Sequence, residues 1–215
     1  MDNIEKLIEI FKEFPGIGPR QAKRFVYFLL HKNESYVSEL AKNITSVRKT
    51  VHTCDTCFRF FPLNHWQNGR ASTKGALANT CPICQSDKRD KASLMLVSHD
   101  IDFENIEKTG SYQGYYFILG GTIPILEKTP EKRIRQKELL DSIKKKKKEG
   151  LSEIIIALNY NPEGENTLLY LTEILSKELL DSKIKISTLG RGLSTGVELE
   201  YSDSETIKNA LQNRK

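Results

Sequence analysis

The sequence predicts an α/β protein in which a helical N-terminal segment and a four-cysteine segment precede a mainly parallel sheet flanked by helices. Three observations carry this prediction. Apolar residues recur at helical spacing near the start, the four cysteines form two pairs, and short β-rich runs alternate with helical stretches after residue 92. The 215 residues suffice for one or two compact domains.

The composition excludes several classes of protein. Hydrophobic residues make up 38% of the chain and charged residues 28%, which permits a packed core and argues against wholesale disorder. No run of about eighteen apolar residues occurs, and residues 1–6 lack the basic and then apolar layout of a signal peptide. We therefore expect a cytoplasmic protein that does not enter a membrane.

Positive charge is concentrated in the first part of the chain. Residues 1–92 hold 15 basic and 9 acidic side chains, whereas residues 93–215 hold 18 and 19. Such an asymmetry suits contact with a polyanion, because each neutralised phosphate releases condensed counterions. A basic surface that serves only solubility is the alternative that composition leaves open.

Three helices are expected before the cysteines. Apolar residues at helical spacing predict the first over residues 3–13, and a stretch rich in Gly and Pro then interrupts the pattern. A second helix begins at Pro19, a residue favoured in the first helical turn, and continues to Leu30. A third helix follows over about residues 35–48.

The connection between the first two helices has the pattern of a helix-hairpin-helix, a motif of sequence-independent DNA binders. Gly16 and Gly18 let the backbone approach a ligand closely, and free N–H groups at the start of the second helix point at a phosphate. Arg20, Lys23 and Arg24 add three cations in the next two turns. These five residues are the candidate DNA-binding residues, and no base is read by them. An ordinary turn between helices is the alternative.

All four cysteines lie in two C-x-x-C pairs, Cys54 with Cys57 and Cys81 with Cys84. In a reducing cytosol such pairs hold zinc far more often than they form disulfides. Two pairs complete a tetrahedral four-thiolate site that leaves no position for water. We therefore predict one structural Zn²⁺ ion per chain. A redox pair or a chance spacing is the alternative.

The two cysteine pairs are separated by 23 residues. The insert, residues 58–80, is rich in Gly, Asn, Ser and Thr and is expected to form a projecting loop. His52 and His65 are the other side chains of this region that could compete as metal ligands.

After residue 92 the sequence pattern changes, and it predicts strands that alternate with helices. Strands are predicted at residues 94–97, 115–119, 154–158 and 184–186, and helices near residues 103–109, 134–149 and 165–180. This alternation predicts a largely parallel sheet that is covered on both faces. Functional loops are then expected where the strands end.

Two charged stretches of this half are open to more than one interpretation. Glu163 and Glu165 follow the third strand and open a helix, where carboxylates either stabilise the helix N-terminus or serve a function. Lys144–Lys148 is a run of five lysines that cannot share one helix face. Solvation is the first interpretation of the run, and an accessory contact with a polyanion is the second.

The order of these parts resembles the bacterial RecR family of recombination mediators over nearly the whole chain. Any one block is a weak signal, but five in order are specific. The matching blocks are residues 15–20, the four cysteines, residues 109–121 with Thr-Gly-x-Tyr-x-Gly and Leu-Gly-Gly, Asn159 with residues 163–165, and residues 191–201 with Arg-Gly-Leu and Leu-Glu-Tyr.

The resemblance implies a Toprim-like sheet domain and a role in recombinational DNA repair. It implies a non-catalytic DNA clamp that works with RecO-like and RecF-like proteins to load RecA on single-stranded DNA. The DNA can be single-stranded, duplex or gapped. It also implies a homo-oligomer, expected to be a tetrameric ring around DNA, since a compact chain of this length has a radius of gyration of only about 17 Å.

The resemblance also divides the chain and assigns residues to roles. Arg20 and Arg24 occupy the positions expected to contact phosphate, and Lys23 is added on charge alone. The acidic loop with Asn159, Glu163 and Glu165 matches a segment implicated in partner binding. The expected divisions are a DNA-binding domain at residues 1–52, a zinc-finger segment at 53–92, a Toprim domain at 93–188 and a C-terminal segment at 189–215.

Two other functions compete with a clamp. A catalytic Toprim enzyme, such as a magnesium-dependent nuclease, primase or topoisomerase relative, holds Mg²⁺ on a Glu and an Asp-x-Asp motif. Ser98, Asn159 and Asn161 stand at those positions here, so we expect no enzyme activity. One weakly held ion stays open on Asp100 or Asp102 with Glu163 and Glu165. The second competitor is a plain zinc-containing DNA-binding scaffold.

Overall fold

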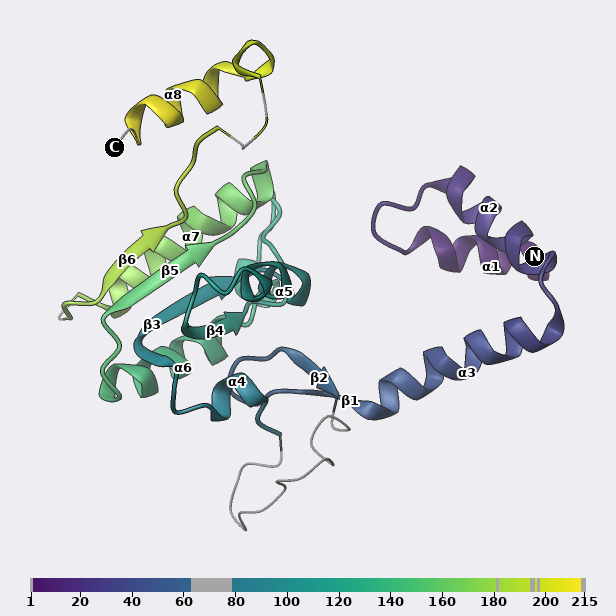
Figure 1. Ribbon diagram of the computed structural model, residues 1–215, viewed down its shortest axis with the longest axis horizontal. Helices are drawn as coiled ribbons and strands as arrows, with labels where there is room; N and C mark the ends of the chain where they lie inside the picture. The colour runs from purple at the N-terminus through teal and green to yellow at the C-terminus, as the bar shows by residue number, and fades with distance from the viewer. Residues whose placement is uncertain (1, 63–78, 181, 194–195, 197, 214–215) are drawn as a thin grey trace. The chain divides into compact units, whose positions relative to one another are not determined.

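The computed structural model describes residues 2–62, 79–180, 182–193, 196 and 198–213. The chain divides into two compact units; the described residues up to His52 form the main part of the first, and most of those after it form the second. The helices, strands and 3-10 turns (η) follow one another as α1 (Asn3–Lys12), α2 (Pro19–Leu30), α3 (Glu34–Thr50), β1 (Val51–Thr53), β2 (Phe60–Pro62), α4 (Pro82–Gln85), β3 (Asp90–Val97), α5 (Asp100–Lys108), β4 (Gly114–Ile118), η2 (Pro130–Lys132), α6 (Gln136–Lys148), β5 (Glu153–Ala157), α7 (Pro162–Glu178), β6 (Lys185–Thr188), η3 (Leu199–Tyr201) and α8 (Ser204–Gln212) (Figure 1).

The first unit is helical and has a small core. Of its described residues, Ala22 and Val26 on α2 are the buried ones. The rings of Phe11 and Phe25 meet edge to face, with centroids 5.8 Å apart, and so join α1 to α2. The side chain of Asn33 caps α3 by accepting a hydrogen bond of 2.9 Å from the Tyr36 amide. Local capping and a few apolar contacts therefore define these helices.

The second unit is built on a four-stranded sheet with the order β4-β3-β5-β6, in which every neighbouring pair is parallel. Leu96 of β3 lies beside Phe117 of β4 on one side and Ile156 of β5 on the other. All three side chains are buried, because a parallel sheet with crossover helices has no solvated face. The predicted α/β class is confirmed.

Helices cover both faces of this sheet (Figure 1). Side chains alternate along β3, so Leu94 and Leu96 pack in the core shared with α6 and α7, whereas Met95 and Val97 pack in the core shared with α5. The continuous apolar run in the sequence is explained by this double burial. The carboxyl ends of the strands then lie at one edge of the sheet, where the predicted functional loops begin.

The predicted strands and helices of this half are all present, with boundaries that move by a few residues. The largest shift is at β3, which begins at Asp90 rather than at residue 94. α5 begins at Asp100 rather than at residue 103, because the Asp102 carboxylate caps the helix by accepting a hydrogen bond of 3.0 Å from the His99 amide. Of the expected projecting loop, residues 63–78 lie outside the described residues. None of the described helices is long and apolar enough to cross a membrane.

The expectation that the run Lys144–Lys148 is solvated is wrong at one position. Lys146 on α6 is only 8% exposed, whereas the four other lysines of the run are exposed. Lys146 lies on the same helical stripe as the core residues Leu139 and Ile143, so the helix carries it into the interior. Helical periodicity, rather than composition, decides this burial.

Candidate functional site

The four cysteines come together from two distant stretches of the chain. Their sulfur atoms all lie within 4.8 Å of one another, and Cys54, Cys57 and Cys81 are buried while Cys84 is half-buried. The sulfurs of Cys57 and Cys81 are 3.6 Å apart. Two thiolates on one tetrahedral zinc ion are separated by about 3.8 Å when each Zn–S bond is about 2.3 Å. The cluster therefore fits a four-thiolate metal site.

The four cysteine thiols also shift one another's pKa values. The contact between Cys54 and Cys57 lowers the pKa of the Cys54 thiol and raises the pKa of the Cys57 thiol, because one sulfur accepts the hydrogen bond that the other donates. Four thiolates cannot coexist in this space without a cation. A divalent ion bound by all four would remove that conflict.

No other group of three or more His, Cys, Asp or Glu side chains in the described part of the chain is arranged to hold a metal. His52 on β1 is not a member of the cluster, and His65 lies outside the described residues. The candidate ligand set among the described residues is thus the four cysteines that the C-x-x-C spacing predicts. β1 and β2 pair with each other beside the first cysteine pair and bring its flanking residues together.

The first cysteine pair is anchored to the parallel sheet, a relationship that spacing alone did not reveal. Phe58 follows Cys57 and has φ of 63°, a left-handed conformation that is uncommon for a bulky residue. Its ring packs against that of Phe117 with centroids 5.3 Å apart, and the Arg135 guanidinium lies 5.4 Å from the ring centroid. The one sign of this contact in the sequence was the aromatic residue Phe58 directly after Cys57.

The hairpin between α1 and α2 presents backbone and cations to solvent. Gly16 has φ of 76°, so a left-handed turn separates the helices, whereas Gly18 has ordinary φ and caps α2. The first turn of α2 contains no acidic residue. The free N–H groups of this turn carry partial positive charge, which favours an anion.

Arg20, Lys23 and Arg24 are all exposed on the first two turns of α2. Of the described carboxylates, none lies within ion-pair distance of these three cations. Arg24 donates a hydrogen bond of 3.4 Å to the side-chain amide oxygen of Gln21, one turn earlier on the same helix. The structure therefore brings the five predicted residues to one end of α2, where no described carboxylate neutralises the positive charge.

A pocket of about 470 Å³ lies at the carboxyl edge of the sheet, between the start of α7 and the C-terminal segment. Arg191 is central to it: the guanidinium donates a hydrogen bond of 3.1 Å to the Glu165 carboxylate and forms an ion pair with the Glu205 carboxylate at 3.6 Å. It also lies 4.1 Å from the centroid of the Tyr160 ring, whose hydroxyl donates to the Leu189 carbonyl at 2.6 Å. These contacts join the loop after β5 to the last helix, α8.

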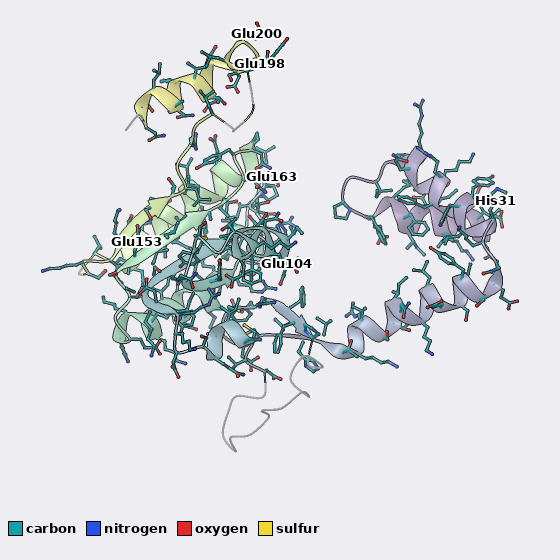
Figure 2. All side chains as sticks on the ribbon, in the orientation of Figure 1. His31, Glu104, Glu153, Glu163, Glu198 and Glu200 are labelled. Carbon is teal, nitrogen blue, oxygen red and sulfur yellow. The ribbon has the colours of Figure 1, made fainter. Side chains whose placement is uncertain are left out.

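The structure separates the predicted partner-binding residues. Glu165 lines the pocket, but Glu163 accepts a hydrogen bond of 2.9 Å from the hydroxyl of Thr122, on the loop after β4. Figure 2 shows Glu163 and Glu153 at opposite ends of the sheet, with Glu163 at the end where the loops gather. Asn159 is exposed, and its carbonyl leaves no space for a Cβ at Gly164.

The acidic residues that would hold Mg²⁺ do not converge. Asp100 accepts a hydrogen bond of 2.7 Å from the Phe60 amide, and Asp102 caps α5. Ser98, at the end of β3, is fully buried, and its hydroxyl has no hydrogen-bond partner among the described residues. The open possibility of one ion on Asp100 or Asp102 with Glu163 and Glu165 is therefore not supported among the described residues.

Sequence reasoning overlooked two contributors to the pocket. Arg191 belongs to the Arg-Gly-Leu block, but its pairing with Glu165 joins residues 26 positions apart. Tyr160 lies between two asparagines and offered only its aromatic character as a signal. A side chain that connects two loops leaves no periodicity or spacing in the sequence.

Three family models match the chain in order. Residues 4–48 match "RecR, helix-hairpin-helix", residues 92–190 match "Toprim domain", and residues 192–215 match "RecR, C-terminal". These ranges correspond to the hairpin helices, the parallel sheet with its helices, and the segment that contributes α8 to the pocket.

Full-length relatives show the same similarity. The chain is 32% identical to "Recombination protein RecR" of Bdellovibrio bacteriovorus, with 98% of this chain and 96% of the relative covered. It is 34% identical to the protein of the same name from Phytoplasma mali, with 98% and 93% covered, and 32% identical to that of Dehalococcoides mccartyi, also with 98% and 93% covered.

Proposed function

The chain belongs to the RecR family of recombination proteins, and on this premise we propose that it is a non-catalytic DNA clamp in recombinational repair. It would bind single-stranded, duplex or gapped DNA without reading sequence and help RecO-like and RecF-like partners to load RecA. The reduced thiols and the DNA ligand suit work in the cytoplasm.

The observation that carries the proposal is the exposed end of α2. Its free N–H groups and the cations Arg20, Lys23 and Arg24, which pair with none of the described carboxylates, would form a surface for a phosphate backbone. Contacts to phosphate oxygens carry no sequence information, so binding through them would ignore sequence. The closely spaced Gly16 and Gly18 leave open space beside the backbone, where a phosphate could approach.

Self-association is the second part of the proposal. The described residues of α1 and α3 include none that is buried, and large apolar side chains stay exposed on the first three helices and in the connection between α1 and α2. These are Ile10, Phe14, Phe25, Tyr27, Phe28, Leu30, Tyr36, Val37, Ile44 and Val47. So much exposed apolar surface is typical of an interface. One chain is too small to surround DNA, so a tetrameric ring built through this unit is proposed.

A structural zinc ion completes the proposed protein. Buried thiolates in two C-x-x-C pairs are the ligands that zinc prefers, and a closed four-sulfur set leaves no coordination position for a substrate. The ion would supply folding energy to residues 53–92, between a DNA-binding domain at 1–52 and a Toprim domain at 93–188. The C-terminal segment, 189–215, would complete the pocket with Glu165, which we propose as the partner-binding region.

Absence of catalysis is also proposed. The positions that hold Mg²⁺ in catalytic Toprim proteins are occupied by Ser98, Asn159 and Asn161, and the nearby Asp100 and Asp102 are engaged in hydrogen bonds. We expect no magnesium-dependent nicking, joining or primer synthesis. Magnesium-dependent nicking that disappears in Glu163→Gln would contradict this.

One experiment tests the clamp as a whole. Light scattering should measure the mass of the full chain across a wide concentration range, with and without DNA, and fluorescence anisotropy should measure DNA binding at several salt concentrations. We expect an oligomer and affinity that falls steeply with salt on every DNA sequence. Ile44→Glu, on the exposed side of α3, should reduce the mass, while Lys42→Glu on the same helix serves as the charge control. A monomer under all conditions would refute the ring.

A further inference from the structure

A second group of cations lies in the sheet unit, apart from the hairpin and from the pocket around Arg191. It lines a pocket of about 430 Å³ where the segment after β4 meets the start of α6, which we call the basic pocket. Basic and acidic side chains nearly balance over residues 93–215, so the excess of cations here is local. The charged residues that line the basic pocket are Lys132, Arg133, Arg135 and Lys137, with Glu131 and Glu138.

Arg135 is half-buried, and contacts on two sides hold its guanidinium in place. One terminal nitrogen, Nη1, donates a hydrogen bond of 2.9 Å to the Ile118 carbonyl, and the group lies 5.4 Å from the centroid of the Phe58 ring. Gly120 has φ of 88°, and a Cβ there would stand 2.7 Å from Nη1. Glycine at this position therefore lets the guanidinium lie against the backbone. A group positioned in advance loses little entropy when a ligand binds.

The positive charge of Arg135 and the two lysines is not matched by nearby acids. Of the described carboxylates, none lies within ion-pair distance of Arg135, Lys132 or Lys137. Arg133 differs, because it pairs with Glu127. A guanidinium has five N–H donors, and the described residues accept one hydrogen bond from the Arg135 side chain. Its other donors suit a ligand that carries several acceptor oxygens.

Phosphate is the anion that this arrangement fits. The planar guanidinium matches two phosphate oxygens at once, and a lysine ammonium adds a mobile point charge. Partial burial of Arg135 strengthens the attraction, because the local dielectric is lower than in water. The described residues that line the basic pocket include no aromatic side chain, so a nucleotide base would find no ring on which to stack. This favours the phosphodiester of a nucleic acid over a free nucleotide.

We propose that the basic pocket is a second phosphate-contact site, through which the sheet unit binds the DNA backbone with Arg135, Lys132 and Lys137. The inference rests on the proposed DNA binding and adds a contact that lies outside the helix-hairpin-helix. Such a contact raises affinity for every DNA sequence, because phosphates carry no sequence information. Glu131 and Glu138 are exposed, so salt and water screen their repulsion of the phosphate.

The test compares two pairs of exposed lysines in the full chain. Lys132→Ala combined with Lys137→Ala removes two cations of the basic pocket, whereas Lys145→Ala combined with Lys147→Ala removes two near the other end of α6. Fluorescence anisotropy measures DNA affinity at several salt concentrations. We expect the first variant to flatten the slope of log affinity against log salt by about 1–2 on every sequence, because phosphate contacts are lost. The second variant should keep the wild-type slope.

Two further measurements locate the contact. Acetylation followed by mass spectrometry should show that DNA protects Lys132 and Lys137 more than Lys145 and Lys147. Arg135→Lys keeps the charge but loses the planar guanidinium, so it should weaken DNA binding by about 10-fold while retaining most of the salt slope. Thermal unfolding of the same variant checks that the fold is intact, and the lysine variants test the site if it is not.

The contrary outcomes separate this inference from the proposed function. If the wild type binds no DNA, both fail. If Arg20→Ala combined with Arg24→Ala flattens the salt slope but Lys132→Ala combined with Lys137→Ala does not, the basic pocket fails and the hairpin stands. Equal flattening in both lysine pairs would show a general effect of charge and would also overturn the pocket.

A last comparison distinguishes the sources of the phosphate. Calorimetry measures binding of ATP and of inorganic phosphate to the wild type and to the Lys132→Ala, Lys137→Ala variant. We expect neither ligand to bind at concentrations at which DNA saturates the protein. Binding of either one that disappears in the variant would assign the basic pocket to a small phosphorylated ligand and would overturn the DNA contact.

Discussion

The amide of Ile118 donates a hydrogen bond of 2.8 Å to the carbonyl of Cys57, which joins the end of β4 to a residue of the cysteine cluster. The same Ile118 pairs with Val97 across the sheet. The ring of Phe58, next in sequence to Cys57, packs on Phe117 in the core. The cysteine cluster and the parallel sheet are thus joined by hydrogen bonding and packing. We expect a substitution that destabilises one of them to destabilise the other.

Cys81→Ser tests this connection. Loss of one thiolate should reduce metal content below one ion per chain and lower the free energy of unfolding by an amount on the order of several kcal/mol, because buried sulfurs lose their cation. Hydrogen exchange should accelerate at the end of β4. Asp87→Ala, whose side chain is 95% exposed near the same cysteines, is the control. Unchanged exchange in metal-free Cys81→Ser would contradict the coupling.

Arg20→Ala combined with Arg24→Ala tests the DNA surface. We expect weaker binding to the same degree on every sequence, and a slope of log affinity against log salt that flattens by about 2, since two phosphate contacts are lost. Anisotropy titrations at four or more salt concentrations give the slope. Lys42→Ala combined with Lys49→Ala removes two exposed cations from α3 and should change the slope less than the arginine variant does. An unaltered slope would mean that these arginines make no phosphate contacts and that the hairpin only connects two helices.

Gly16→Ala and Gly18→Ala form a matched pair in the same hairpin. Gly16 has φ of 76°, which costs an alanine about 1–2 kcal/mol, whereas Gly18 has φ of −84° and open space around it. Chemical denaturation should therefore show a larger loss of stability for Gly16→Ala. DNA affinity reports separately on Gly18→Ala, where an added methyl group would stand beside an approaching phosphate. Equal stability losses would contradict the left-handed turn.

Glu165→Ala and Glu163→Ala test the pocket. Glu165 bonds Arg191 inside it, whereas Glu163 bonds Thr122 on a neighbouring loop. We expect both variants to bind DNA normally and Glu165→Ala to lose more affinity for a RecO-like partner, because Arg191 would lose its hydrogen-bonded carboxylate and keep only the longer ion pair with Glu205. Pull-down and calorimetry measure the partner, and anisotropy measures DNA. Full partner affinity in both variants would place the binding surface elsewhere.

Much of the fold was predictable because its signals are local. Pro19 starts α2, helical spacing marks α1, and apolar runs mark strands that are buried on both faces. The clustering of Cys54, Cys57, Cys81 and Cys84 was predictable because paired C-x-x-C spacing is typical of residues that bind one metal ion together.

The sequence by itself determined the strands, the helices, the two cysteine pairs and the cationic hairpin, since each depends on residues close together in the chain. Only the tertiary structure decided that Lys146 is buried beside Tyr115, and that Arg191 bridges Glu165 and Glu205. Such contacts join separate elements, and their distances depend on how helices pack on the sheet and where its loops turn. Local spacing contains no information about either.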